Sequence, residues 1–269
     1  MVALMFPQMD PGFGAIIGMG GSCFVSLVDD ATVHKSYEIW VNGKRRSYYP
    51  ETCEDDLARE AAVYAHLGRH DNILVCHGLD EIHNDPTVHA LRLELAPLGT
   101  VRTLIQKTLN DPLPAATRLQ MCRDTTAAVA HIHRKGVWHS DLSCRNLMIF
   151  AGHRVKLGDF GGAIIEAATH QFPATAAEEE QYALPCRGRE ADDLPRVKRE
   201  LFALGSCLYE IMAWQRPFQG LEDHEVRRRY EAGDFPPLAS LPAAVGDVVD
   251  KCWQEALGSA EEAVHRLRE

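Results

Sequence analysis

The sequence lacks several features that would assign it to a specialised class. Its 269 residues include eight cysteines, but no two stand at CxxC spacing, so neither a zinc site nor a disulfide framework is indicated. Basic residues are in deficit, with 28 Lys and Arg against 38 Asp and Glu. The resulting net charge of −10 argues against non-specific binding to nucleic acid or to an anionic membrane. Since 46% of the residues are hydrophobic and no low-complexity segment is visible, we expect a globular protein.

A convincing membrane segment is also missing. The longest uncharged run, residues 11–28, contains five glycines and barely reaches the length of a membrane span. The first ten residues, MVALMFPQMD, lack the basic start of a signal peptide and reach Pro7 early. We therefore expect a soluble, cytoplasmic or nuclear protein with reduced thiols, and no signal peptide or transmembrane segment.

The character of the chain changes near residue 95. Before it, strand-like runs surround one expected helix over residues 51–67, whose first turn is acidic. After the Pro97–Gly99 punctuation, helical patterns dominate. The expected strands are 13–18 and 23–28 on either side of a glycine turn, 31–37, 73–82 and 88–95, then 146–150 and 154–158. The expected helices are 101–109, 114–136, 198–213, 222–232, 243–256 and 259–268, with 162–195 irregular. A strand-rich half before a helical half predicts an α+β enzyme of two lobes.

One segment concentrates residues suited to chemistry. Residues 137–162 read VWHSDLSCRNLMIFAGHRVKLGDFGG. They hold His139, Asp141 and Asn146, followed by Asp159-Phe160-Gly161. This segment resembles the catalytic loop and metal-binding DFG motif of eukaryotic protein kinases. The resemblance spans about residues 13–268 and implies one kinase domain over 1–269, with a small β-rich N-lobe (about 1–95), a hinge (about 94–99) and a mostly helical C-lobe (about 100–269).

The resemblance extends to the nucleotide site. Residues 18–25, GMGGSCFV, are similar to the glycine loop GxGxxGxV, although Cys23 replaces the third glycine. The VHK tripeptide ends in Lys35, the implied phosphate-binding lysine, and Glu60 on the next helix is its implied partner because a buried ammonium needs one. The backbone groups of Glu94 and Ala96 would bind adenine. The implied ATP-binding residues are Gly18, Gly20, Gly21, Val25, Lys35, Glu94 and Ala96.

The same resemblance implies roles for the central motif. Asp141 would orient the acceptor hydroxyl and accept its proton. Asn146 and Asp159 would hold Mg²⁺, which prefers oxygen ligands. Ser143 stands where serine/threonine kinases often carry a lysine, so Arg145 is our candidate for the cation that clamps the γ-phosphate. The implied catalytic residues are therefore Asp141, Lys35, Glu60 and Arg145.

Several positions depart from the family pattern. Ser140 replaces the arginine of HRD that receives an activation-loop phosphate in many kinases, so we expect activity without such phosphorylation. Cys186 replaces the glutamate of the APE motif, and Ala260 lies near the place of its arginine partner, so both halves of that ion pair are expected to be missing. Glu200 stands where an aspartate normally caps the catalytic loop. We interpret the acidic run 178–180 as solvated, with contact to a basic surface as the alternative.

The sequence thus predicts an ATP- and Mg²⁺-dependent kinase that phosphorylates a protein, with serine or threonine favoured over tyrosine only because that class is more common. A pseudokinase that binds ATP or acts as a scaffold is the main alternative, motivated by the departures at Cys23, Ser140, Cys186 and Glu200. A small-molecule phosphotransferase of the same fold would share the HxDxxxxN pattern, but such enzymes usually lack the Asp-Phe-Gly motif. The protein substrate and the oligomeric state cannot be read from the sequence.

Overall fold

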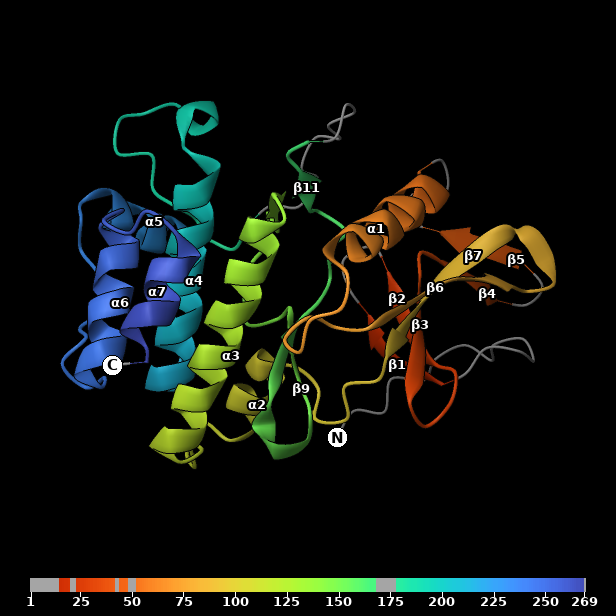
Figure 1. Ribbon diagram of the computed structural model, residues 1–269, viewed down its shortest axis with the longest axis horizontal. Helices are drawn as coiled ribbons and strands as arrows, with labels where there is room; N and C mark the ends of the chain where they lie inside the picture. Colours follow the sequence, from red (N-terminus) through yellow and green to blue (C-terminus); the bar gives the residue numbers. More distant parts are fainter. Residues whose placement is uncertain (1–14, 20–22, 42–43, 48–51, 168–177, 269) are drawn as a thin grey trace. The chain divides into compact units, whose positions relative to one another are not determined.

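The structure is a computed structural model, and it describes residues 15–19, 23–41, 44–47, 52–167 and 178–268. The chain divides into two compact units. The first comprises residues 1–68 and 74–95, and the second comprises residues 69–73 and 96–269. Strands dominate the first unit and helices the second, which confirms the predicted α+β class (Figure 1).

The first unit is built on a five-stranded antiparallel sheet of order β1-β2-β3-β7-β6. Helix α1 packs on β6 and β7, and it buries Leu57, Val63 and Leu67. A separate hairpin, β4 with β5, was not predicted from the sequence, and residues 42–43 between its strands lie outside the described residues. The elements of this unit are β1 (Ile16–Met19), β2 (Phe24–Leu27), β3 (Thr32–Ser36), β4 (Glu38–Val41), β5 (Lys44–Ser47), α1 (Cys53–Leu67), β6 (Cys76–Ile82) and β7 (Asp85–Glu94).

The second unit is a helical assembly. Helix α3 packs against α4 and α7, and α4 packs against α6 (Figure 1). Gly205 permits the close approach of α4 to α6, because a Cβ added there would lie 2.6 Å from the Cβ of Cys252. The helices are α2 (Val101–Lys107), α3 (Ala115–Arg134), α4 (Arg196–Ala213), α5 (Asp223–Glu231), α6 (Ala243–Trp253) and α7 (Ala260–Arg266). Each corresponds to a predicted helix, with ends shifted by up to three residues.

Two small antiparallel pairs position the loops that carry the motif. Strand β9 (Leu147–Ile149) pairs with β10 (Val155–Leu157), and β8 (Val137–Trp138) pairs with β11 (Ile164–Ile165). The segment between β8 and β9 contains Asp141 and Asn146, and Asp159 follows β10 directly. Residues 69–73 join this unit because Asn72 Nδ2 donates to the carbonyl of Val155 and the Leu157 amide donates to the carbonyl of Asn72.

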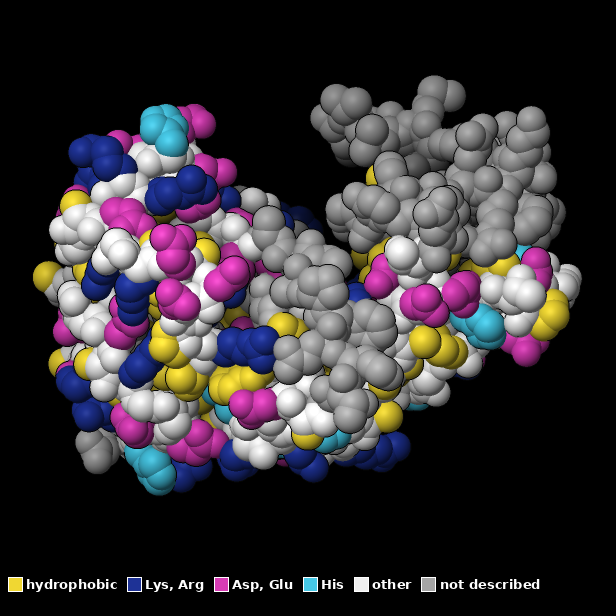
Figure 2. Space-filling model, turned by 90° about the horizontal axis from the view of Figure 1, so that it is seen from above, with side chains coloured by type: hydrophobic (Ala, Val, Ile, Leu, Met, Phe, Trp, Pro, Cys, Tyr) yellow, Lys and Arg dark blue, Asp and Glu magenta, His cyan; other side chains and the backbone are white. Residues whose placement is uncertain are grey.

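The surface of the second unit carries charges of both signs. On the face drawn in Figure 2, basic and acidic side chains lie interspersed over this unit rather than in one patch of a single sign. Many are paired along helices, such as Glu225 with Arg228 and Arg229 on α5. Of the helices in the described ranges, none combines the length and the apolar character needed to cross a bilayer.

Candidate active site

The Lys35 side chain is buried in the first unit as an ion pair. Its Nζ atom lies 2.7 Å from Oε2 of Glu60, which projects from α1. The two side chains are only 6% and 0% exposed, and pairing lowers the cost of burying either charge. The lysine is set by sheet register, since Lys35 lies opposite Val25 on β2 and Leu91 on β7. The structure therefore brings together the lysine and glutamate that the sequence selected.

The other nucleotide-contacting candidates are only partly described. Gly20 and Gly21 lie outside the described residues, and Gly18 lies in β1 with its Cα close to Val25 in the strand register. Glu94 is held to Val75 twice, because its amide donates to the Val75 carbonyl and its Oε1 accepts from the Val75 amide at 2.7 Å. The carbonyl of Ala96 accepts from the amide of Gly99. Their binding of adenine stays a prediction.

In the second unit, Asp141 and Asn146 are interlocked. The Asn146 Nδ2 atom donates to the backbone carbonyl of Asp141 at 2.8 Å and to its Oδ2 at 3.2 Å. Because the nitrogen of this amide is committed to Asp141, Oδ1 is the side-chain atom of Asn146 that can serve as a metal ligand. The carbonyl of Asn146 also accepts from the amide of Gly158, the residue before Asp159. One hydrogen-bond chain thus links the two halves of the motif.

His139 makes a second connection between the two halves of the motif. Its Nδ1 accepts from the Asp141 amide at 3.3 Å, and its Nε2 lies 3.0 Å from the carbonyl of Gly158. The ring also contacts the fully buried Phe160, with centroids 5.1 Å apart. Asp159, between Gly158 and Phe160, adopts a left-handed backbone with φ of 61°.

The carboxyl groups of Asp141 and Asp159 influence one another. Burial raises the pKa of Asp141 above its ordinary value, and the nearby Asp159 charge adds to this effect, whereas His139, Arg145 and Asn146 oppose it. A divalent cation would relieve the repulsion between the two carboxylates. The Asn146 Oδ1 and the Asp159 carboxylate are hard oxygen donors of the kind that Mg²⁺ prefers. The residues present therefore fit this ion.

Glu200 on α4 caps the catalytic loop. Its Oε2 accepts from the His139 amide at 3.1 Å, and its Oε1 accepts from the Ser140 amide at 2.8 Å. His133 Nε2 lies 3.5 Å from the same carboxylate. Burial raises the pKa of Glu200, but the hydrogen bond and charge of His133 and the hydrogen bond from the Ser140 amide outweigh it and leave the pKa lowered. The glutamate thus satisfies the loop amides despite its extra methylene.

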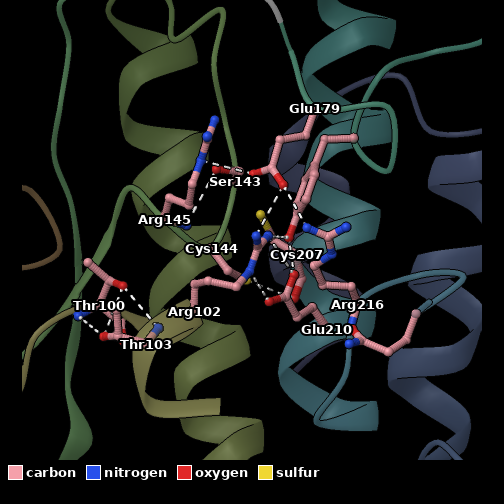
Figure 3. Close-up of polar contacts among 12 residues, drawn as sticks. Thr100, Arg102, Thr103, Ser143, Cys144, Arg145, Glu179, Cys207, Glu210 and Arg216 are labelled. Atoms are coloured by element: carbon pink, nitrogen blue, oxygen red, sulfur yellow. Dashed lines mark hydrogen bonds and ion pairs between the residues drawn. The ribbon is translucent and has the colours of Figure 1, made fainter. Parts of the chain in front are cut away.

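The interpretation of the acidic run 178–180 as solvated is wrong, because its three carboxylates form ion pairs within the chain. Each glutamate pairs with arginine of this same chain, and their side chains are only 12%, 15% and 20% exposed. The partners are Arg199 for Glu178, then Arg102, Arg145 and Arg216 for Glu179, and Arg227 for Glu180. Figure 3 shows the arginines converging on Glu179.

A buried cluster next to this run was missed by the sequence analysis. Arg102 donates to Glu210 from Nε at 2.6 Å and from Nη2 at 3.1 Å, and also to the hydroxyl of Tyr182 at 2.8 Å (Figure 3). The side chain of Glu210 is fully buried. A signal was present, because Glu210 interrupts the apolar helix ELFALGSCLYEIMAW, and a buried carboxylate requires a partner. The partner itself, more than a hundred residues away, could not be identified from the sequence.

An ion pair between other residues lies close to the position of the missing APE pair. Cys186 and Ala260 carry no charge, as noted from the sequence, but Arg189 and Glu255 form a two-pronged ion pair with distances of 2.8 and 2.9 Å. The same guanidinium donates to the carbonyls of Pro185 and Cys186. This ion pair therefore links the chain around residues 185–189, where Arg189 lies, to Glu255 just beyond α6.

We expect Arg189→Gln to lower the free energy of unfolding by about 1 kcal/mol at neutral pH, the scale of a partly exposed pair. The hydrogen bond from Arg189 lowers the pKa of Glu255, so this stabilisation is present above the unfolded pKa of about 4.3 and is lost as pH falls through the lower folded pKa. Urea unfolding of wild type and of Arg189→Gln, measured from neutral to acid pH, tests this prediction. If the difference in the free energy of unfolding is the same at acid pH as at neutral pH, the ion-pair explanation is wrong.

Together with the α+β fold, these loops have the arrangement of a protein kinase domain. A family model described as protein tyrosine and serine/threonine kinase matches residues 17–260. The chain therefore belongs to the protein kinase family.

Three relatives illustrate the range of the similarity. Serine/threonine-protein kinase PknB of Mycobacterium leprae is 26% identical over 88% of this chain, and the match covers 37% of that protein. Aurora kinase B of Mus musculus is 28% identical over 80% of this chain and 61% of its own length. Serine/threonine/tyrosine-protein kinase HT1 of Arabidopsis thaliana is 27% identical over 63% of this chain and 43% of its own length. The matches thus cover between 37% and 61% of the length of these relatives, less than two thirds in each case.

Proposed function

We propose that this chain transfers the γ-phosphoryl group of ATP to a serine or threonine hydroxyl of a protein. The observation that carries the proposal is the interlocked Asp141–Asn146 pair, joined through Gly158 to Asp159. The name of the relative PknB, a serine/threonine-protein kinase, supports serine or threonine as the acceptor. Bound ATP with Mg²⁺ would supply the phosphoryl group and neutralise its charge.

In this mechanism the residues of the chain position the reacting groups and remove the proton of the acceptor hydroxyl. Asp141 orients the acceptor hydroxyl and takes its proton as the bond from oxygen to the γ-phosphorus forms and the bond to the β-phosphate oxygen breaks. Asn146 and Asp159 would hold the cation through their oxygens. Lys35, paired with Glu60, would bind phosphate oxygens, and Arg145 would supply a further positive charge.

A peptide array incubated with radiolabelled ATP tests the proposal. We expect transfer that requires Mg²⁺, and phosphoamino-acid analysis should find the label on serine or threonine. Label on tyrosine would overturn the acceptor assignment. Label on small hydroxylated metabolites, with none on peptides, would overturn the protein substrate.

We further expect the activity to persist after complete dephosphorylation of the protein. Ser140 offers no cation to an activation-loop phosphate, whereas the glutamates of the acidic run already pair with arginines. The measurement is the rate of peptide phosphorylation after phosphatase treatment and phosphatase removal, with intact mass confirming that no phosphate remains. Loss of activity that returns upon phosphorylation would contradict the prediction.

A further inference from the structure

Glu179 lies where three separate parts of the second unit meet. Its carboxylate is 3.1 Å from Nη1 of Arg102 at the start of α2 and 3.3 Å from Nη1 of Arg216, just beyond α4. It is also 2.9 Å from Nε of Arg145 in the catalytic loop. The three arginines point toward it from different elements in Figure 3, and the glutamate side chain is only 15% exposed.

The position of Glu179 does not depend on Arg145. Arg102 is fixed by its two hydrogen bonds to the fully buried Glu210 and by the hydroxyl of Tyr182, and it holds Glu179 in turn. These partners are packed within the second unit, where the Arg102 side chain is 7% exposed. The carboxylate is therefore a fixed anchor.

Arg145, in contrast, has a side chain that is 48% exposed. A half-exposed arginine carries about 2 kcal/mol of rotamer entropy, so it needs a partner to stay in one place. Besides its contact with Glu179, Nη2 of Arg145 lies 3.4 Å from Oδ1 of Asp141. The guanidinium thus lies between the anchor and the acceptor-orienting carboxylate.

We propose that Glu179 is a positioning residue that holds Arg145 beside Asp141. The inference rests on the proposed phosphoryl transfer, in which a fixed cation at this place meets the negative charge of the transferring group. Loss of an interaction that is made only in the transition state lowers kcat and leaves the KM for ATP unchanged. The Glu179 carboxylate would thereby order Arg145 of the catalytic loop without any phosphorylation.

The test compares Glu179→Gln, Arg145→Gln and the double variant. Removal of one charged donor from such a site costs about 10²-fold in kcat, which we expect for Arg145→Gln. Glu179→Gln keeps the size of the side chain but leaves the arginine mobile, so we expect about a tenfold loss in kcat with an unchanged KM for ATP. The double variant should be no slower than Arg145→Gln alone. Glu180→Gln is the matched control, since Glu180 pairs with the exposed Arg227 on α5, and it should match wild type.

Three kinetic results would overturn the proposal: independent effects in the double variant, Glu179→Gln as active as wild type, or an equal loss in Glu180→Gln. If wild type transfers no phosphate at all, the proposed function fails but the positioning role is still measurable. NMR relaxation of the Arg145 Nε–H group should then show a rigid side chain in wild type and Glu180→Gln and a mobile one in Glu179→Gln. Equal mobility in all three proteins would reject the anchor.

Discussion

Replacement of Asp141 by asparagine is expected to lower kcat by about 10²- to 10⁴-fold, the contribution typical of a positioned proton acceptor. Asparagine has the same shape and leaves the hydrogen bond from Asn146 Nδ2 to the backbone carbonyl of residue 141 in place. Its amide, however, neither accepts the hydroxyl proton nor carries the charge that faces Arg145. Binding of MgATP, followed as a shift in melting temperature, should be retained because Asn146 and Asp159 remain.

The matched control is Asp111→Asn, in an exposed turn after α2, which should behave as wild type. Equal activity of wild type and Asp141→Asn would show that Asp141 does not serve the reaction. If both proteins bind MgATP but neither transfers phosphate, the chain is the nucleotide-binding module that the departures at Ser140 and Cys186 suggested. The pair of measurements therefore distinguishes an enzyme from a binding protein.

The second large effect is on stability, in the cluster around Arg102. We expect Arg102→Met to lower the free energy of unfolding by about 3–5 kcal/mol, because Glu210 would stay buried without its charged partner. The loss also removes one of the arginines that hold Glu179. Urea unfolding followed by tryptophan fluorescence measures it, since Trp214 and Trp253 are buried in the second unit.

The double variant Arg102→Met/Glu210→Leu separates pairing from packing. Replacement of a whole buried ion pair by apolar side chains costs much less than removal of one partner, because no uncompensated charge remains. We therefore expect the double variant to recover most of the stability lost in Arg102→Met. If the double variant is as unstable as the single one, the loss reflects packing around the arginine stem rather than the charge of Glu210.

Local patterns in the sequence were sufficient for the helices and for the order of the motifs. Helix α4 is buried at every position from Glu200 to Met212, and the buried residues of α3 lie between Met121 and Ile132, so the apolar composition of a short stretch of chain was enough to indicate each helix. Likewise, Asp141 and Asn146 are five residues apart, so their hydrogen bonds follow from one tight loop. The hairpin β4–β5 also has a local signal, because the dipeptide Asn42-Gly43 between the two strands is typical of a tight connection.

The arginine partners of the acidic run, in contrast, could not be identified from the sequence. The run Glu178-Glu179-Glu180 has the composition of a solvated stretch, and the sequence does not show which of the chain's basic residues, if any, will face it. Arg102, Arg145 and Arg216 come from three elements that packing brings to one carboxylate. The pair Arg189–Glu255 is likewise separated by 66 residues.

By itself, then, the sequence determined the family, the helices and the compact catalytic loop, because each rests on contacts between near neighbours or on a pattern of residue types. Only the tertiary structure decided which charges neutralise which, including the anchoring of Arg145 by Glu179 and the burial of Glu210 under Arg102. The physical reason is that an ion pair requires two side chains within about 4 Å, and for residues far apart in the chain that proximity is set by the packing of whole helices.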